Sequence, residues 1–376
     1  MPRLRWGDGS GSLHGAILYV VFFVLALVGL PTLVVWGRWL SMPRKSTEFT
    51  IRLLREDLGK VVEMDLEEYL AGVMAAEMPA DFHCEALKAQ AVAARTYALY
   101  RLGEQRNEQR DSVGREADLS SDFRSGQAWM SAEAQRERWG WYAYFQKRRS
   151  IIQSVEATRG EVITYRGEPI FAAYHSTSGG FTQAAGDYFN EVPYLQGVPS
   201  PGEEISPYYR TTKQLSWREA ATKLGLEIPI EVTPILEAEG SSLSDEPVVY
   251  EPPESGDGQL THNPDRAGVT TGEVALPTLD LARLFHITQL YPTGRVKNVE
   301  VLGQSFTGRQ IREKLGLRSN WFSVIPTRDG IIFEVRGNGH GVGMSQYGAQ
   351  RMAMAGYSYQ DILLHYYTDI ELVKWY

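Results

Sequence analysis

The feature that most constrains this chain is an uncharged apolar stretch from Ala16 to Trp36, which precedes a long and more polar region. As a helix, the stretch would rise about 31 Å, enough to cross the hydrocarbon core of a bilayer. A cleaved signal peptide is the alternative, but the stretch does not end at a small-x-small cleavage site. We therefore predict an uncleaved transmembrane anchor, with a tail over 1–15 and a linker over 37–48.

The charges that flank the stretch do not orient it. Arg3 and Arg5 precede it, whereas Arg38, Arg44 and Lys45 follow it. Positive charge marks the cytoplasmic side of a span, and this difference is too small to decide the topology. The chemistry of the remaining chain must decide it.

Residues 49–376 are numerous enough for one large or two modest domains with a core. The formal net charge is -8 and no basic stripe with interleaved aromatic residues occurs, so we expect no nucleic-acid partner. Cys84 is the single cysteine, which excludes an internal disulfide framework and a cysteine-cluster zinc site. The histidines form no HExxH or HxH motif, so we predict no metal and no cofactor.

The residue pattern indicates an α+β fold of mixed helices and antiparallel strands. Helices are expected from Leu66 to about Met78, from Glu85 to about Tyr100, over Ala132 to Arg149, after Thr307, and from Ser345 to about Ala355. Asp65 is the predicted N-cap of the first helix. Strands are expected over Phe49 to Arg55, Val61 to Met64, Glu161 to Tyr165, Pro169 to Tyr174, near Val296 to Leu302, and in a hairpin from Trp321 to Arg336. Residues 240–273 lack apolar periodicity and are predicted to be a disordered insertion.

Glu77 continues an apolar stripe on the first predicted helix. The stripe consists of Leu66, Leu70 and Val73, and eleven residues at about 100° each return to within about 20° of the start. A carboxyl group facing the core is partly desolvated, which raises its pKa and suits it to general-acid catalysis at a glycosidic oxygen. The alternative is a half-exposed glutamate at a helix end that pairs with a cation.

Lys88 and Arg95 lie seven residues apart on the second predicted helix, so they share a face within about 20°. Two cations on an alanine-rich helix can hold a carboxylate or a sugar oxygen. Taken alone, the pair is more typical of a solvated stripe.

Two polar, glycine-containing segments follow predicted strands. His175, Ser176, Thr177, Ser178, Gly179 and Gly180 form a turn that lacks the glycines of a nucleophile elbow, so free backbone amides that bind oxygens fit it better. Glycines alternate over 337–343, with a spacing that does not match a dinucleotide site. They allow close backbone approach to a ligand or to another loop. The side chains beside this loop are His340, Ser345, Gln346 and Tyr347.

Five segments together resemble the SpoIID/LytB family, whose stage II sporulation D members are peptidoglycan lytic transglycosylases. They are EYLAGVMAAEMP (68–79), EALKAQAVAARTY (85–97), ATRG (157–160), YHSTSGG (174–180) and GHGVGMSQYGA (339–349). The resemblance covers residues 49–374 apart from the insertion. It implies a catalytic domain over 49–376.

The resemblance also implies a reaction and a site. The β-1,4 bond between N-acetylmuramic acid (MurNAc) and N-acetylglucosamine (GlcNAc) would be cleaved to a 1,6-anhydroMurNAc end, with Glu77 as acid and base. Lys88 and Arg95 match positions that support activity. The implied substrate-binding residues are Lys88, Arg95, Tyr174, His175, Ser176, Ser178, His340, Ser345, Gln346 and Tyr347. Some relatives bind zinc through cysteines beside the turn; this chain has none there, so no metal is expected.

The family implies a place and partners as well. Its members thin the septal wall during forespore engulfment, together with a SpoIIP-like amidase/endopeptidase and a SpoIIM-like membrane protein. Because peptidoglycan lies outside the cytoplasmic membrane, the expected arrangement is a single-pass protein of the engulfing mother-cell membrane, with a cytoplasmic N-terminus and the catalytic domain outside.

Two alternatives remain open. The same superfamily contains non-catalytic accessory proteins that activate a wall amidase, and the joint presence of Glu77, Lys88 and Arg95 favours the enzyme over them. A serine amidase or esterase that uses Ser178 is disfavoured, because no nucleophile elbow and no clear His/Asp partner accompany that serine.

Overall fold

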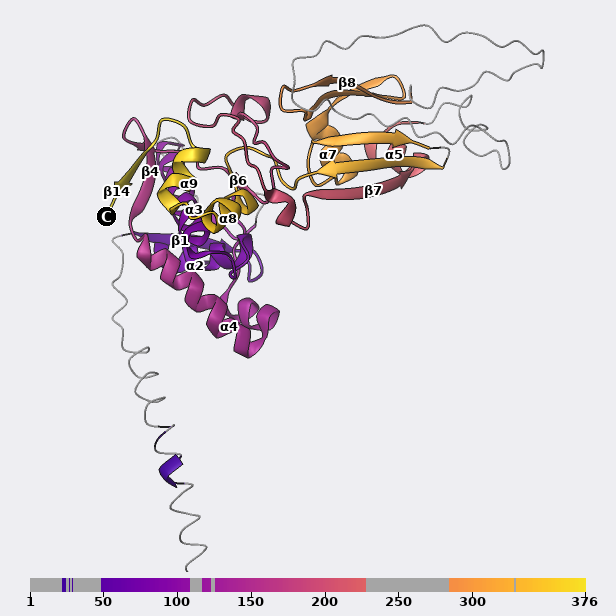
Figure 1. The fold of residues 1–376 in the computed structure, drawn as a ribbon. Coiled ribbons are helices and arrows are strands. Elements are labelled where there is room, and N and C mark those ends of the chain that lie inside the picture. Colours follow the sequence, from indigo (N-terminus) through magenta and orange to yellow (C-terminus); the bar gives the residue numbers. More distant parts are fainter. Residues whose placement is uncertain are drawn as a thin grey trace, which may run out of the picture. The chain divides into compact units, whose positions relative to one another are not determined.

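A computed structural model describes residues 22–24, 27, 29, 49–108, 117–122, 126–227, 284–327 and 329–376. The chain divides into two compact units, Met1–Glu48 and Phe49–Tyr376, and Figure 1 colours them along the sequence. The second unit mixes helices with small, mainly antiparallel sheets, as the α+β prediction required. The predicted insertion at 240–273 lies outside the described residues.

The predicted membrane anchor and the single-pass localisation are contradicted. Among the residues that the structure describes, no helix is long and apolar enough to cross a membrane. The predicted tail and linker lie outside the described residues.

The second unit begins with an antiparallel hairpin and three helices. These are β1 (Thr50–Arg55), β2 (Lys60–Asp65), α2 (Leu66–Glu77), α3 (Cys84–Glu108) and α4 (Ala132–Ala157), and the short β3 (Leu119–Ser120) pairs in parallel with β1. The Asp65 carboxylate accepts a hydrogen bond from the Glu67 backbone N–H at 2.8 Å, which confirms the predicted N-cap of α2. Gly140 interrupts α4 with a φ of 70°, so this helix is kinked.

Helix α3 lies between two hydrophobic cores, and small side chains line it on opposite sides. It packs against α2, α4, β4 (Glu161–Tyr165), α8 (Gln346–Met354) and α9 (Tyr359–Tyr366) (Figure 1). Ala86, Ala89 and Ala93 enter one hydrophobic core, whereas Ala91, Ala94 and Ala98 enter another. Alanine lets neighbouring helices approach closely and favours the helical backbone, so α3 separates and supports both cores.

Two further sheets complete the part of the unit that carries the candidate site. In one sheet β14 (Glu371–Lys374) and β5 (Glu168–Pro169) flank β4, and both pairings are antiparallel. In the other, β6 (Tyr174–His175) pairs in parallel with β13 (Met344–Ser345), which directly precedes α8. The β6–β13 pairing joins the two polar segments that the sequence singled out.

The remaining elements surround a third core. The antiparallel sheet β11–β12–β7 consists of Phe322–Pro326, Gly330–Arg336 and Arg210–Ser216, and the sheet β10–β9–β8 consists of Gln304–Thr307, Val296–Val301 and Phe285–Leu290. Helices α5 (Trp217–Leu224) and α7 (Gly308–Leu315) pack with these strands. Two short 3-10 turns, Ala185–Asp187 and Glu203–Ile205, lie in the long connection from β6 to β7.

Candidate active site

Glu77 is the last residue of α2. Met78 turns to an extended backbone conformation immediately after it, as expected ahead of Pro79. The Glu77 side chain is half-buried, whereas the three apolar residues of the predicted stripe have no exposed surface: Leu66, Leu70 and Val73. The stripe is therefore buried at its three apolar positions and ends in a partly exposed carboxyl group.

Two hydrogen-bond donors hold the Glu77 carboxyl group. The backbone N–H of Ala128 donates to Oε1 at 2.8 Å, and the Tyr174 hydroxyl is the side-chain donor that lowers the pKa of the group. Burial raises the pKa of Glu77 above its usual 4.5, and these two hydrogen bonds oppose part of that rise. Because Oε1 accepts the Ala128 bond, Oε2 is the oxygen that is free to carry a proton.

The segment 126–131, which we call the strap, crosses α2 ahead of α4. Met130 donates its backbone N–H to the Gly72 carbonyl at 3.1 Å, and the Ser131 hydroxyl caps α4. The Trp129 indole lies against Gly72 so closely that a Cβ there would come within 2.1 Å of Nε1. Gly72 on α2 thus leaves the space in which Trp129 packs. This packing holds the strap where Ala128 contacts Glu77.

Gln127 of the strap is only 3% exposed and makes three side-chain hydrogen bonds. Its Oε1 accepts from the Tyr69 hydroxyl at 3.2 Å. Its Nε2 donates to the Ala94 carbonyl at 3.2 Å and to the Tyr174 hydroxyl at 3.0 Å. Gln127 therefore connects α2 and α3 to the tyrosine that contacts Glu77.

The turn at 174–180 and the glycine loop at 337–343 are joined along their backbones. Besides the β6–β13 pairing, isolated β-bridges join Thr177 to Asn338 and Gln183 to Val342. The prediction that alternating glycines allow close approach to another loop is confirmed at Gly341. Gly341 has a φ of +81° and lies against the Arg295 guanidinium group, and at Gly337, with a φ of +80°, a Cβ would come within 2.6 Å of the Thr177 carbonyl oxygen of the turn.

His175 and His340 both bind the Val342 peptide and are both neutral near neutral pH. The His340 Nδ1 accepts the Val342 N–H at 3.1 Å, and the His175 Nδ1 lies 3.1 Å from the Val342 carbonyl, to which it must donate. Burial, reinforced by the positive charge of Arg312, lowers the pKa of His340 to about 3. Burial also lowers the pKa of His175 well below 6.5. Neither imidazole is charged at the pH where Glu77 would act.

His340 also connects the loop to Tyr174, because its ring forms a hydrogen bond with the Tyr174 backbone carbonyl. Its ring centroid lies 5.5 Å from that of His175. The turn and the loop therefore fix the backbone of the residue whose hydroxyl contacts Glu77.

Ser178 is fully buried and takes part in the internal structure of the turn. Its hydroxyl donates to Glu203 Oε1 at 2.8 Å, and the Gly179 N–H donates to Glu203 Oε2 at 2.8 Å. Arg295, also fully buried, donates to the Ser178 carbonyl at 2.6 Å. Ser178 is thus engaged within the turn, and its predicted binding role stays a prediction.

Three more predicted binding residues have no accessible surface for a ligand. His175 is 4% exposed, Ser345 is 0% exposed and caps α8 through the Gly348 N–H, and Gln346 is 4% exposed and donates to Gln90. These side chains stabilise the loop–helix junction. A sequence motif does not reveal this burial by neighbouring elements, and the predicted binding roles of the three residues stay predictions.

Ser176 and Tyr347 are more exposed. Both are half-buried, and the Tyr347 N–H donates to the Ser176 carbonyl at 3.1 Å. The Tyr347 ring packs edge-on against Phe82, with centroids 5.0 Å apart. With Tyr174 and His340, they are the predicted binding residues of the turn and the loop that retain accessible surface.

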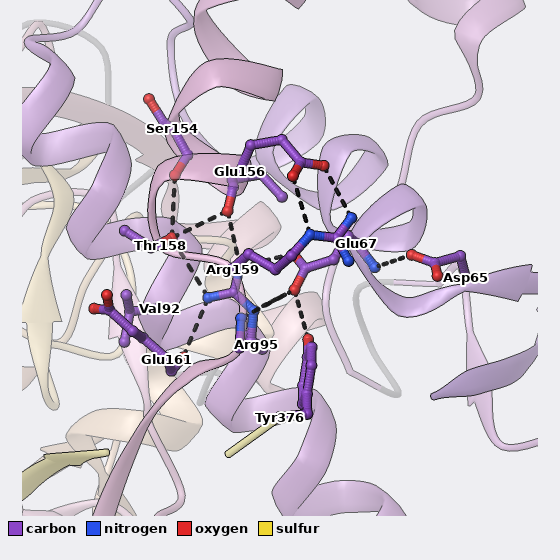
Figure 2. A network of polar contacts seen from close by, with 12 residues as sticks. Asp65, Glu67, Val92, Arg95, Ser154, Glu156, Thr158, Arg159, Glu161 and Tyr376 are labelled. Atoms are coloured by element: carbon purple, nitrogen blue, oxygen red, sulfur yellow. Dashed lines mark hydrogen bonds and ion pairs between the residues drawn. The ribbon is translucent and has the colours of Figure 1, made fainter. Parts of the chain in front are cut away.

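Arg95 does not lie beside Glu77. Figure 2 shows its guanidinium group and the Tyr376 hydroxyl converging on Glu67. Arg95 donates to Glu67 Oε1 at 2.9 Å and Oε2 at 2.7 Å, and the ion pair has exposures of 0% and 3%. Its other donors reach the carbonyls of Val155 and Glu161. Arg95 is therefore engaged in an internal ion pair, and its predicted contact with substrate stays a prediction.

Lys88 has a different environment from Arg95, although both lie on α3. Its ammonium group pairs with Glu85 at 2.7 Å and lies 5.6 Å from the centroid of the Tyr359 ring. The Lys88 side chain is 26% exposed, so it retains access to solvent. Within the ranges that the structure covers, no group of three or more His, Cys, Asp or Glu side chains is placed to hold a metal ion.

Comparison with known proteins identifies the family. Residues 55–165, which include α2, the strap and all of α4, match the family described as stage II sporulation protein (SpoIID). The chain is 34% identical over 329 residues to stage II sporulation protein D of Bacillus subtilis (strain 168), covering 87% of this chain and 80% of that relative. The chain belongs to the stage II sporulation protein D family. The Bacillus amyloliquefaciens SpoIID protein is 33% identical over the same share of both chains.

A more distant relative carries a different name. The chain is 29% identical over 317 residues to a Bacillus subtilis protein named amidase enhancer, covering 81% of this chain and 40% of that protein. The chain is therefore similar both to sporulation proteins and, more distantly, to a protein named amidase enhancer.

Sequence reasoning missed the strap residues Gln127 and Ala128 of this SpoIID chain. They follow a charged segment and precede a helix, in a stretch with no periodicity to mark them. One weak signal was present: an amide side chain next to Ala128 and Trp129, ahead of the Ser131 helix cap. Such a signal does not indicate which carboxyl group the strap would reach.

Proposed function

We propose that this SpoIID chain is a lytic transglycosylase that cleaves the β-1,4 bond between MurNAc and GlcNAc in peptidoglycan. The observation that carries the proposal is the Glu77 carboxyl group, which is half-buried, has a raised pKa and is held by the Ala128 N–H. A carboxylic acid still protonated near the working pH can protonate a glycosidic oxygen. One such group suffices when an internal hydroxyl replaces water.

The proposed reaction uses Glu77 twice. Its Oε2 proton passes to the glycosidic oxygen as the bond from MurNAc C1 to that oxygen breaks, and GlcNAc leaves with a free 4-hydroxyl. The Glu77 carboxylate then accepts the proton of the MurNAc C6 hydroxyl while O6 bonds to C1. The product is a 1,6-anhydroMurNAc end, and Glu77 regains its proton.

The carboxylate stage is supported by the same two donors. A carboxylate that accepts hydrogen bonds from Ala128 and Tyr174 is stabilised relative to one that is buried without them. Burial thus favours the acid form while the hydrogen bonds support the base form. This balance keeps both forms accessible within one catalytic cycle.

We propose that the partly exposed residues Lys88, Tyr174, Ser176, His340 and Tyr347 contact the glycan. The buried members of the predicted set, Arg95, His175, Ser178, Ser345 and Gln346, would act by holding the backbone. The proposed setting is thinning of the septal wall in forespore engulfment, with a SpoIIP-like amidase/endopeptidase and a SpoIIM-like membrane protein as partners.

The test is digestion of purified peptidoglycan, with and without stem peptides, by the full chain. Mass spectrometry should detect 1,6-anhydroMurNAc ends, and Glu77→Gln should reduce their rate of formation by about 10²–10⁴-fold. Glu68→Gln is the matched control, because Glu68 is exposed on the same helix. Reducing ends in place of anhydro ends would indicate a hydrolase and contradict the proposal.

A second candidate function is activation of a wall amidase without cleavage of glycan. The relative named amidase enhancer favours it. In this case no anhydro ends would form, and the chain would accelerate release of stem peptides by an added amidase. Glu77→Gln would then leave the acceleration unchanged.

A further inference from the structure

The orientation of the buried Gln127 amide can be deduced from its partners. The Ala94 carbonyl can only accept a hydrogen bond, so the amide atom 3.2 Å from it must be the nitrogen. The amide oxygen is then the atom beside the Tyr69 hydroxyl, which must donate to it. The Ala94 carbonyl thus fixes which end of the amide faces each tyrosine.

This orientation sets the direction of the Tyr174 hydroxyl proton. Gln127 Nε2 donates to the Tyr174 oxygen at 3.0 Å, so the hydroxyl proton cannot point back toward Gln127. Burial raises the pKa of Tyr174 well above 10, so the hydroxyl keeps this proton near neutral pH. The Glu77 carboxyl group, which accepts from the next strap residue, Ala128, is the acceptor that remains for the hydroxyl proton, so the proton is directed to it.

We propose that Gln127 is a positioning residue for Glu77: its amide, locked by Ala94, directs the Tyr174 hydroxyl proton onto the Glu77 carboxyl group. The proposal rests on the proposed role of Glu77 for its catalytic meaning. The geometry itself does not depend on that role. Gln127 touches neither substrate nor Glu77 and acts through Tyr174.

The effect is largest at the carboxylate stage of the reaction. Once Glu77 has given up its proton, Oε1 still accepts the Ala128 N–H, and the Tyr174 hydroxyl supplies a second donor. A donor with a fixed direction requires no reorganisation when the negative charge develops. If the hydroxyl proton pointed elsewhere, the carboxylate would lose one of its two donors.

Gln127→Glu reverses this direction with little change in shape. The new carboxyl group has at most one proton, and the Ala94 carbonyl would take it. No donor is then left for Tyr174, whose proton would turn toward the new acceptor and away from Glu77. The pKa of Glu77, followed by ¹³C NMR and assigned by its absence in Glu77→Gln, should rise by about one unit.

When the new carboxyl group is ionised, its charge also raises the pKa of Glu77 directly, so the variant is measured in two backgrounds. In Tyr174→Phe no hydroxyl remains to turn, and only the direct effect persists. We expect Gln127→Glu to shift the Glu77 titration more in the wild-type background than in Tyr174→Phe. Equal shifts in the two backgrounds would overturn the proposal.

Two controls keep the test decisive. Tyr69→Phe removes a donor to Gln127 without freeing the amide from Ala94, so the Glu77 titration should stay in place. If Gln127→Glu does not fold, Gln127→Met removes the directing N–H without adding a carboxyl group and should shift the titration in the same direction as Tyr174→Phe. An unchanged titration in Gln127→Met would then overturn the proposal.

The titration is independent of catalysis, so the two proposals can fail separately. If wild-type protein forms no anhydro ends, the proposed function fails while the NMR result still decides the role of Gln127. If anhydro ends form but Gln127→Glu has equal effects in both backgrounds, only the positioning role fails. In an active enzyme, the alkaline limb of the pH profile should move upward with the titration.

Discussion

Replacing Arg95 by alanine should destabilise the fold and leave the chemistry at Glu77 intact. The substitution strands the Glu67 carboxylate, which is 4% exposed and loses hydrogen bonds of 2.9 and 2.7 Å. Breaking one partner of a buried ion pair costs about 3–5 kcal/mol. Glu67 keeps the Tyr376 hydroxyl at 2.5 Å and the Gly160 N–H at 3.4 Å, so we expect about 3 kcal/mol.

The free energy of unfolding, measured in urea by circular dichroism, checks the size of this effect. Arg101→Ala is the matched control, because Arg101 forms a partly exposed pair with Glu104 on the same helix and should cost at most about 1 kcal/mol. Arg95→Met with Glu67→Leu should cost less than Arg95→Met alone, because no unpaired charge remains.

Enzyme kinetics of the folded Arg95→Ala protein decide between support and substrate binding. If Arg95 only stabilises the fold, the KM for glycan should be nearly unchanged below the unfolding transition. An increase in KM of tenfold or more, with the free energy of unfolding unchanged, would refute the structural role and restore the predicted substrate contact.

Two further predictions concern Glu77 and the strap. Because folding raises the pKa of Glu77 above 4.5, its favourable contribution is complete below pH 4.5 and is lost as the pH rises through the raised value. The melting temperature of Glu77→Gln relative to wild type should therefore increase between about pH 4 and pH 8; a constant difference would contradict the raised pKa. Gly72→Ala should displace Trp129, cost about 1–3 kcal/mol and reduce glycan cleavage. Gly103→Ala on α3 has open space and should be neutral or stabilising, so equal losses in urea melts of both variants would contradict the packing argument.

Local features of the fold were predictable, because short-range patterns determine them. The N-cap of α2, the hairpin β11–β12 and the start of α8 were expected close to where they occur. Helix α9 and strands β7 and β14 were not predicted. Helix α9 is only 8 residues long, and strand β14 only 4. Such short elements are stabilised by tertiary packing rather than by their own periodicity.

Long-range contacts explain what the sequence did not reveal at the candidate site. Helical spacing places Lys88 and Arg95 on one face, but α3 has neighbours on several sides, and its faces do not divide simply into core and solvent. The partner of Arg95 is Glu67, 28 residues away, and the strap reaches Glu77 across 51 residues. Predicting either contact requires the tertiary arrangement, which single-sequence patterns do not contain.

The pairing of β6 with β13 has a consequence for how the protein is made. Tyr174 is held by Met344, and its strand has no partner until that late segment has been synthesised. Contacts between residues so distant along the chain form late in folding, because the intervening loop must close first. A ribosome-bound chain could already have formed α2 and the strap while the Tyr174 hydroxyl was still unplaced. The site around Glu77 would therefore be completed only near the end of synthesis, so an unfinished chain would not yet carry the finished arrangement around this carboxyl group.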